Sequence, residues 1–101
     1  MQTNLKEEVL KVKFAAKKLN VMTHPVRVKI IELLLENQKL NVTQIYEKLG
    51  LIQAETSLHL GLLKDYGILN KVREGKMSIY SVNTEGLQYI LKIANDLQKK
   101  K

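Results

Sequence analysis

The tightest constraint on this chain is a very short link between two helix-forming segments. The first segment starts at Asn41 or Thr43, either of which can cap a helix by accepting a backbone hydrogen bond. It ends at Gly50, a residue typical of helix ends. Only two residues separate Gly50 from the second segment, at 53–66. Because so short a link forces the second helix to turn sharply against the first, residues 41–66 are predicted to form a helix-turn-helix.

The second helix of this pair has two unlike faces at helical spacing. The side expected to pack inward carries Thr56, Leu60 and Leu63. The outward side has no charge and little bulk, and it consists of Gln53, Ala54, Ser57, Leu58 and Gly61. Thr56 and His59 border the outward side and are further candidates for DNA contact. Such a face suits a DNA major groove, where base edges are read by hydrogen bonds and methyl contacts. An ordinary amphipathic helix with a weakly polar side is the alternative.

The charge of the chain favours a polyanionic partner. Lys and Arg outnumber Asp and Glu by 17 to 10, which gives a formal net charge of +7 and a pI near 9.7. Such a balance favours phosphate binding through counterion release. Residues 51–66, however, contain one basic side chain, Lys64, against Glu55 and Asp65. If DNA is the partner, residues outside this helix should supply the affinity and the helix should supply the discrimination.

Composition excludes several classes of protein. With 101 residues, 45% of them apolar, residues 1–101 are predicted to form one small domain. The chain has no cysteine, which excludes disulfides, thiolate metal sites and thiol switches. No apolar run approaches the roughly 20 residues of a membrane span, and the amino terminus lacks the apolar core of a signal peptide. A cytoplasmic protein without a membrane partner is therefore expected.

The first and last helices, expected at 4–19 and 84–98, each carry a narrow apolar stripe. The stripe of the first consists of Leu5, Val9, Val12, Ala16 and Leu19. The stripe of the last consists of Leu87, Ile90, Leu91, Ala94 and Leu97. The first stripe could pack on its own domain or on a second copy. Because a monomer would leave both stripes in water, the two helices are predicted to form the interface of a homodimer.

Between these ends, Pro25 starts a helix that should run to about residue 36, since proline has no amide hydrogen to leave unpaired at the first helical position. Apolar side chains cover more than half of its circumference, so it is predicted to be the most buried element. His24 is expected to cap this helix or to stay at the surface rather than to bind a ligand. Residues 40–42 could form a short extended stretch.

After Gly67 the apolar period changes to two. Residues 68–73 and 77–82 flank a turn in which Gly75 permits a positive φ, so residues 67–83 are predicted to form a β-hairpin. Arg73 and Lys76 lie at its tip. A cationic hairpin after a helix-turn-helix is typical of a wing that contacts phosphate or a minor groove, although basic turns also serve solubility.

With this order of elements, the chain resembles the ArsR/SmtB family of winged-helix transcriptional repressors over residues 20–83. The resemblance is carried by His24-Pro25-Val26-Arg27, Leu49-Gly50-Leu51, Gln53 with Ser57-Leu58-His59-Leu60, Tyr66-Gly67-Ile68-Leu69, and Gly75-Lys76 with Ile79-Tyr80. It implies a mainly α fold with a small antiparallel β-hairpin, a winged helix-turn-helix in the order α-α-α-α-β-β-α. It also implies a homodimer joined through its first and last helices, with Gln53, Ser57 and their neighbours facing operator DNA.

The chain departs from the family pattern at several positions. Ile52 replaces a usual capping serine, Ala54 replaces a small polar residue, and Glu55 adds an anion near the expected DNA side. Asn41-Val42-Thr43 lies where thiolate-binding members have cysteine, valine and cysteine, and the last helix has no histidine to pair with its carboxylates. Amide and carboxylate groups at that spacing would not build a tetrahedral transition-metal site. No metal, cofactor or catalytic residue is therefore predicted.

The predicted function is a sequence-specific, DNA-binding repressor that acts as a homodimer at the nucleoid of a bacterial or archaeal cell. Because Gln53 can pair with adenine and Ala54 and Leu58 can contact thymine methyl groups, an A·T-rich, imperfectly palindromic operator is expected. A winged-helix module that binds protein is the alternative, favoured by the acidic balance of residues 51–66. An enzyme is the weakest hypothesis, since no activated serine or cysteine lies beside His59.

Overall fold

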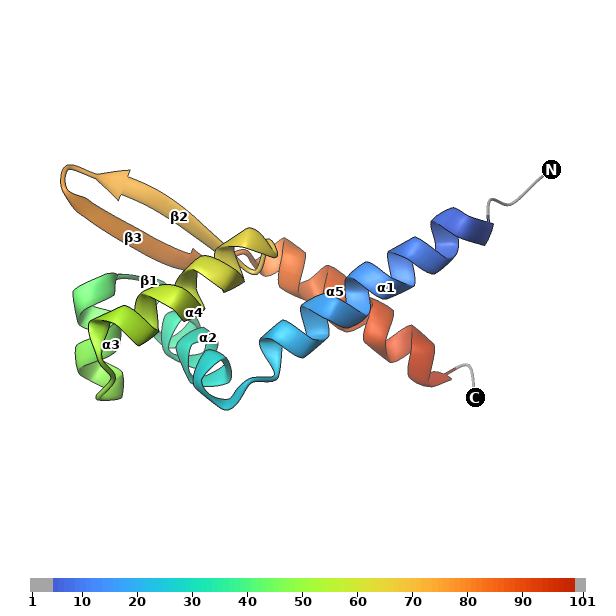
Figure 1. The fold of residues 1–101 in the computed structure, drawn as a ribbon, viewed down its shortest axis with the longest axis horizontal. Coiled ribbons are helices and arrows are strands. Elements are labelled where there is room, and N and C mark those ends of the chain that lie inside the picture. The colour runs from blue at the N-terminus through green and yellow to red at the C-terminus, as the bar shows by residue number, and fades with distance from the viewer. Residues whose placement is uncertain (1–4, 100–101) are drawn as a thin grey trace.

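The computed structural model describes residues 5–99, with side chains as far as residue 96. Within this range the elements are, in order, α1 (Leu5–Met22), α2 (Pro25–Asn37), β1 (Lys39–Asn41), α3 (Val42–Leu49), α4 (Gln53–Asp65), β2 (Leu69–Glu74), β3 (Met77–Val82) and α5 (Thr84–Lys99). Figure 1 shows that α2, α3, α4 and the sheet form one lobe, while α1 and α5 cross each other beyond it. The expected mainly helical, winged helix-turn-helix architecture is confirmed.

The core lies inside this lobe and continues into α5. Its fully buried aliphatic side chains come from four helices and from the start of the wing, and they are Ile30, Leu34, Ile45, Leu60, Leu63, Ile68 and Ile90. Burying an aliphatic side chain of this size stabilises a fold by about 1.5–3 kcal/mol. Helix α2, predicted to be the most buried element, contributes Ile30, Ile31 and Leu34 to the core, no more residues than α4 buries, and Leu35 on its outer side is 51% exposed.

Local hydrogen bonds fix where the helices of the lobe begin and end. Nδ1 of His24 accepts from the amide of Val26 at 3.1 Å, so His24 caps α2 as predicted. Asn41 and Gln44 form a reciprocal capping box at the start of α3, with bonds of 2.8 and 2.9 Å. Gly50 ends α3 in the left-handed conformation, with φ of 67°. These caps determine the direction in which the chain enters α4.

The sheet has one strand more than the predicted hairpin. Strand β1 pairs with β3 on the side away from β2, so the order is β1-β3-β2 and both pairings are antiparallel. Leu40 of β1 lies opposite Tyr80, and both side chains are buried. The short extended stretch expected at 40–42 therefore forms one residue earlier, because Val42 already belongs to α3. The additional strand anchors the base of the wing next to the helix-turn-helix.

A hydrogen-bonded clasp joins the end of α4, the wing and α5. Nδ2 of Asn83 donates to the carbonyl of Gly67 at 3.0 Å, and its Oδ1 accepts from the amide of Gly86 at 3.1 Å. The backbones approach so closely that a Cβ at Gly86 would lie 2.7 Å from the Gly67 oxygen. Only glycine fits there without a shift of the backbone. The clasp sets the position of the wing relative to α4.

The outer helices differ slightly from their predicted ranges. Helix α1 continues to Met22, where the amide of Thr23 donates to the carbonyls of Leu19 and Asn20 at 3.0 and 3.3 Å. Helix α5 runs from Thr84 to Lys99. The first residue of the predicted range 4–19 lies outside the described residues. Among residues 5–99, no helix is long and apolar enough to cross a membrane.

Candidate nucleic-acid interface

Helix α4 presents the two faces that its sequence predicts. Leu60 and Leu63 are fully buried against the core. On the opposite side, Gln53, Ala54 and Ser57 are exposed, and Leu58 is 76% exposed. Gly61 is half-buried, and beyond the backbone of its own helix a Cβ there would have no atom within 4 Å. The outward face, which we call the reading face, consists of Gln53, Ala54, Ser57, Leu58 and Gly61.

Thr56 lies on the inward side of α4, as its helical spacing predicts, and its second assignment as a flanking candidate for DNA contact is wrong. Its side chain is fully buried, and its hydroxyl donates to the carbonyl of Ile52 at 3.0 Å. A threonine hydroxyl is often satisfied in this way by a carbonyl one turn earlier in its helix. Thr56 therefore packs α4 onto the core and cannot reach a nucleic acid.

His59 faces α2 rather than the expected DNA side. Its Nδ1 accepts from Nε of Arg27 at 3.2 Å, and its ring lies 4.8 Å from the ring of His24 at an angle of 49°. Burial, followed by the charges of His24 and Arg27, lowers the pKa of His59 below its ordinary value. His59 therefore helps to hold α4 against α2 and does not belong to the reading face.

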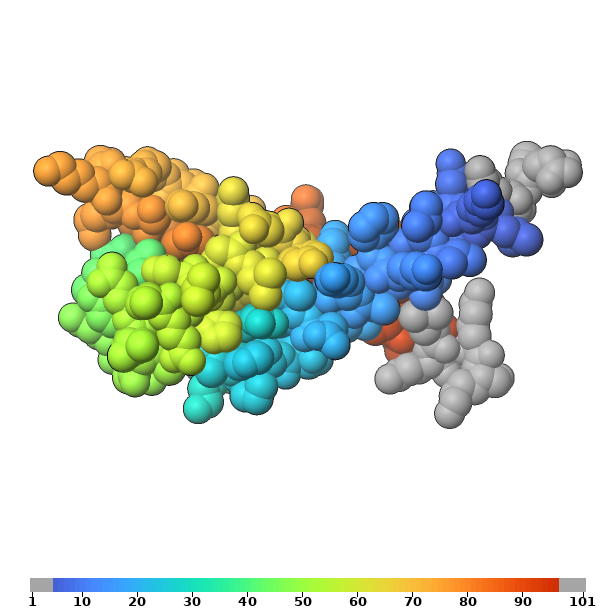
Figure 2. Space-filling model, viewed as in Figure 1, coloured from blue at the N-terminus to red at the C-terminus, as the bar shows by residue number. Residues whose placement is uncertain are grey.

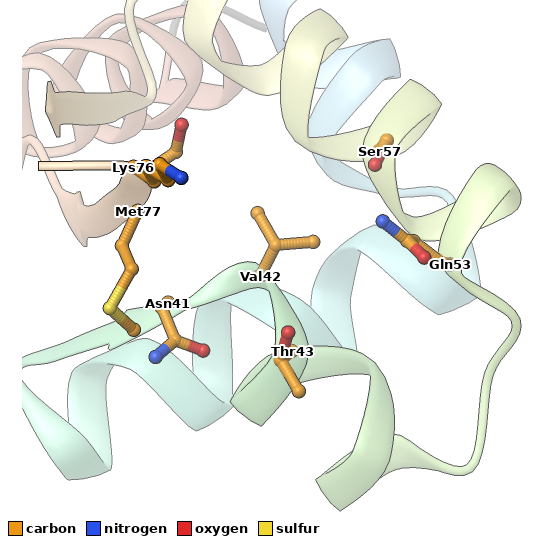
Figure 3. Close-up of a pocket in the computed structure, with 8 residues that line it drawn as sticks. Asn41, Val42, Thr43, Gln53, Ser57, Lys76 and Met77 are labelled. Carbon is orange, nitrogen blue, oxygen red and sulfur yellow. The ribbon is translucent and has the colours of Figure 1, made fainter.

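A polar groove connects the reading face to the wing. It has a volume of about 250 Å³ and is lined by Asn41, Val42, Thr43, Gln53, Ser57, Lys76, Met77 and Ser78. Figure 3 shows the labelled side chains surrounding an open space between the start of α3, the start of α4 and the wing tip. Gln53 and Lys76, which are 23 positions apart in the sequence, thus border one groove. Sequence reasoning missed Thr43 and Ser78, which lie close to Gln53 only in the folded chain.

The tip of the wing is exposed and basic. Glu74 pairs with Met77, which leaves Gly75 and Lys76 as a two-residue turn, and Gly75 has φ of 63°. Arg73 and Lys76 are both exposed. Behind the tip, Nζ of Lys71 lies 6.0 Å from the centre of the Tyr80 ring, across the β2–β3 pair. In Figure 2 the wing lies above α3 and α4 at one end of the molecule, while α1 extends from the other end.

The helix-turn-helix and wing described above agree with the protein family that the sequence matches. The family model described as bacterial regulatory protein, arsR family, matches residues 24–80, which is more than half of the chain. The chain belongs to the ArsR family.

Individual relatives extend the match beyond the helix-turn-helix. The transcriptional repressor PagR of Bacillus anthracis is 36% identical over 93 residues, which cover 92% of this chain and 93% of PagR. The crystal structure of PagR covers 85% of this chain and 98% of its own, with a TM-score of 0.71. NolR from Sinorhizobium fredii is 26% identical over 98% of this chain and 95% of its own, with a TM-score of 0.73.

A further solved structure shares the fold at lower identity. It is a winged helix-turn-helix DNA-binding domain, Mb0332 from Mycobacterium bovis, which is described as homodimeric. It is 22% identical, covers 99% of this chain and 91% of its own, and has a TM-score of 0.70. Like NolR, it aligns with nearly the whole of this ArsR-family chain.

The outer helices of this ArsR-family chain carry more exposed apolar surface than the predicted stripes. Leu5, Val9, Val12 and Leu91 are exposed, as a dimer interface requires. Two side chains that the stripe analysis missed, Leu10 and Phe14, are 51% and 63% exposed. Leu5, Lys6, Val9 and Leu10 line a shallow, mostly apolar hollow of about 350 Å³. The missed signal was the spacing of four between Leu10 and Phe14, which places them side by side on α1.

The assignment of Ile90 to a dimer interface is wrong. Ile90 is only 1% exposed and belongs to the core of its own chain. Leu19 and Leu87 are half-buried and pack against the same core. Ala16 is exposed and Ala94 half-buried, and the side chain of Leu97 lies outside the described residues. The α5 stripe therefore divides, since its first part anchors the helix and Leu91 remains available to a partner.

The described side chains show no group of three or more histidine, aspartate or glutamate residues able to hold a metal ion. Asn41 lies at the place where some ArsR members bind metal through cysteine, and here its Oδ1 accepts from the amide of Gln44 in the capping box. Its side chain thus has a structural role at the start of α3.

Helix α4 begins without a side-chain cap. Ile52 occupies the capping position, makes no capping bond and is 69% exposed. We expect Ile52→Ser to raise the free energy of unfolding by about 1 kcal/mol, because a serine oxygen can accept from an unpaired amide of the first turn. For a domain of this size the melting temperature should rise by roughly 4–8 °C.

The matched control is Ile52→Ala, which removes the same apolar group without adding an acceptor. Thermal unfolding of the three proteins at one concentration measures the effect. A serine variant no more stable than the alanine variant would show that the amides at the start of α4 gain nothing from a cap.

Proposed function

We propose that this chain is a sequence-specific, DNA-binding transcriptional repressor that acts as a homodimer. The observation that carries the proposal is the uncharged reading face of α4, which borders the same polar groove as the cationic wing tip. A face of this kind can enter a major groove while the wing contacts the backbone beside it. The likeness to the transcriptional repressor PagR supports repression as the outcome.

In this proposal the reading face prefers A·T pairs. Gln53 can pair its amide with N6 and N7 of adenine, and Ser57 can donate to or accept from either kind of pair. Ala54 and Leu58 can pack against thymine methyl groups. The reading face offers neither arginine nor lysine for a bidentate contact with guanine. Gly61 lets the helix approach the groove wall closely, since no part of the protein fills the space beside it.

Two copies of the chain would meet through α1 and α5. The exposed apolar side chains of α1, together with Leu91 on α5, form an apolar surface whose contact with water is unfavourable. The neighbour Mb0332, which has the same fold and is described as homodimeric, supports a homodimer. A two-fold dimer presents two reading helices, so its operator should be an imperfect palindrome with half-site centres ~34 Å apart, or a multiple of that distance.

The setting of this activity follows from its target. A repressor works where the chromosome lies, so we place the protein in the cytoplasm, at the nucleoid of a bacterial or archaeal cell. With neither the cysteine ligands of some ArsR members nor a catalytic group, we propose that it carries no metal, thiol sensor or enzyme activity.

A protein-binding module is the second candidate. It is favoured by the large exposed side chains of Leu58 on the reading face and of Ile52 just before α4, and by the acidic balance of residues 51–66. Affinity for random duplex DNA, measured against salt concentration, separates the two functions. A DNA-binding protein should lose affinity steeply as salt rises, because each neutralised phosphate releases counterions. An affinity for DNA that is negligible at low salt would favour the protein-binding module.

The wing should contribute affinity without sequence information. We expect Arg73→Ala with Lys76→Ala to weaken binding about equally on operator and random DNA, since phosphate contacts position the protein but do not read bases. The slope of log affinity against log salt should become shallower by about 2 for each wing that contacts DNA, roughly 0.9 per lost cation. Fluorescence anisotropy with labelled duplexes measures both quantities.

The matched control is Lys29→Ala with Lys39→Ala, which removes the same charge from exposed positions outside the wing. An unchanged slope in the wing variant would remove Arg73 and Lys76 from the interface. A loss confined to the operator would instead make them readers of sequence.

A further inference from the structure

Arg27 joins three helices at one point. Nε of Arg27 donates to Nδ1 of His59 on α4 at 3.2 Å, and Nη1 donates to the carbonyl of Val21 on α1 at 3.0 Å. Arg27 itself lies in the first turn of α2. One guanidinium therefore fastens the helix that carries the reading face to the end of a helix in the proposed dimer interface.

The hydrogen bond from Arg27 gives a partner to a carbonyl at the C-terminal end of α1. The last four carbonyls of a helix have no partner within it, and a cation near them is favourable. Helix α1 has no basic residue in its last turn, so Arg27 supplies that cation from α2. Because the guanidinium is planar and its donors form a rigid fork, the two bonds also fix the direction from Val21 to His59.

The bond to His59 requires a neutral imidazole. An Nδ1 that accepts a hydrogen bond carries no proton, and the ring of His24 packs beside it while its own Nδ1 accepts from Val26. Both histidines in this cluster thus act as acceptors. His59 cannot take up a proton at Nδ1 without losing Arg27.

We propose that Arg27 is a positioning residue. By joining His59 to Val21, it fixes the orientation of α4 relative to α1, and so it sets the separation of the two reading helices in the dimer. The proposal rests on the proposed function, because only a dimer that reads two half-sites needs a defined separation. Arg27 itself contacts no DNA in this scheme and acts through α4.

The link between Arg27 and His59 is sensitive to acid. Burial, and then the charges of His24 and Arg27, lowers the pKa of His59 below 6.5, while Glu55 on α4 acts in the opposite direction. His59 is therefore neutral at neutral pH and accepts from Arg27. When pH falls through the lowered pKa, an imidazolium forms beside the guanidinium, and the hydrogen bond is lost. The link is present above the pKa of His59 and absent below it.

The separation of the two reading helices can be measured directly, because the chain has no cysteine and a single introduced cysteine is then the only site of labelling. A nitroxide on Lys64→Cys, at the exposed last turn of α4, places one label on each reading helix of the free dimer. Pulsed dipolar spectroscopy should give a narrow distance distribution when Arg27 is present. Arg27→Ala should broaden or shift it, while Lys29→Ala, exposed on the same helix, should leave it unchanged. If Arg27→Ala does not fold, Arg27→Lys, which lacks the rigid fork, provides the same comparison.

A pH series tests whether the hydrogen bond between Arg27 and His59 is what fixes the position of α4. The protein with His59 should show a broadened distribution at about pH 5 compared with about pH 7.5. His59→Asn places an amide oxygen near the position of Nδ1 and does not titrate, so its distribution should stay narrow at both values. Broadening of both proteins in acid would assign the effect to other groups and count against the link.

Binding to DNA gives the second readout. Duplexes with one half-site sequence and varied spacers should show a sharp optimum for the Arg27 protein. At the optimal spacing, Arg27→Ala should bind about tenfold more weakly, which corresponds to the free energy of about one charged hydrogen bond. At neighbouring spacings its loss of affinity should be smaller. An unchanged distance distribution with equal loss at every spacing would overturn the proposal. Failure of the proposed function looks different, since the protein that keeps Arg27 would then show no dipolar coupling or no binding to any duplex.

Discussion

Replacing Leu91 by aspartate is expected to convert the protein to monomers and to weaken operator binding by about a hundredfold or more. Leu91 is 50% exposed on α5, where the proposed dimer would bury it. An unpaired carboxylate in an apolar interface costs several kcal/mol. A monomer also loses the high effective concentration with which the second reading helix finds its half-site. Analytical ultracentrifugation measures the first effect and fluorescence anisotropy the second.

The matched control is Leu35→Asp. Leu35 is 51% exposed on α2, which belongs neither to the proposed interface nor to the reading face, so the same chemical change should leave both the dimer and DNA binding intact. A Leu91→Asp protein that sediments as a dimer at micromolar concentration would place the interface elsewhere. If the unaltered protein is a monomer at that concentration, the two apolar surfaces have another role.

Replacing Leu58 by aspartate should abolish specific binding while leaving the fold intact. The side chain is 76% exposed at the centre of the reading face, so the substitution removes little core packing. In the groove, however, a carboxylate would replace the apolar contact with the bases and lie in the negative potential of the DNA, and like charges placed together at an interface cost several kcal/mol. We expect a loss of at least about a hundredfold on the operator, with a melting temperature close to that of the unaltered protein.

Leu58→Ala refines this test, because it removes the contact without adding repulsion. It should weaken binding modestly, and the loss should be smaller on an operator in which uracil replaces thymine, since the methyl group is then already missing. Operator affinity that survives Leu58→Asp would exclude this face of α4 from the groove.

Features of the fold set by local chemistry could be predicted from the sequence. The caps at His24 and Asn41, the end of α3 at Gly50 and the turn at Gly75 each depend on residues within one or two turns of chain. For strand β1 the sequence indicates only a possible extended stretch. Three residues are too few to show an alternating pattern, and its partner β3 lies about 40 positions later.

The errors have a common physical cause. A stripe of apolar residues shows that a helix buries one side, but not whether the partner is its own chain or a second copy. Ile90 and Leu91 are neighbours in one stripe, yet Ile90 is buried in its own core while Leu91 is half exposed. The sequence assigns Thr56 both to the inward side and, as a candidate for DNA contact, to the border of the outward side. The rotation of α4 against the core, which buries Thr56, decides between the two.

The contact between Arg27 and His59 could not be predicted from either segment alone. The two residues are 32 positions apart, and each has an ordinary local role, one in the first turn of α2 and the other on the flank of α4. Both residues are among those that carry the family resemblance, but the resemblance did not predict a contact between them. Their connection depends on the packing of α1, α2 and α4, which only the folded chain specifies.

The central claim is that a two-fold dimer reads DNA with the outward face of α4, and selection from a library of random duplexes tests it most directly. Our account predicts enrichment of imperfect palindromes with A·T-rich half-sites, whose centres lie ~34 Å apart or at a multiple of that distance. It also predicts that Gln53→Ala relaxes the choice of base at one position in each half-site without altering the spacing. Enrichment of G·C-rich half-sites, of sites without two-fold symmetry, or of no sequence above the starting library would contradict it.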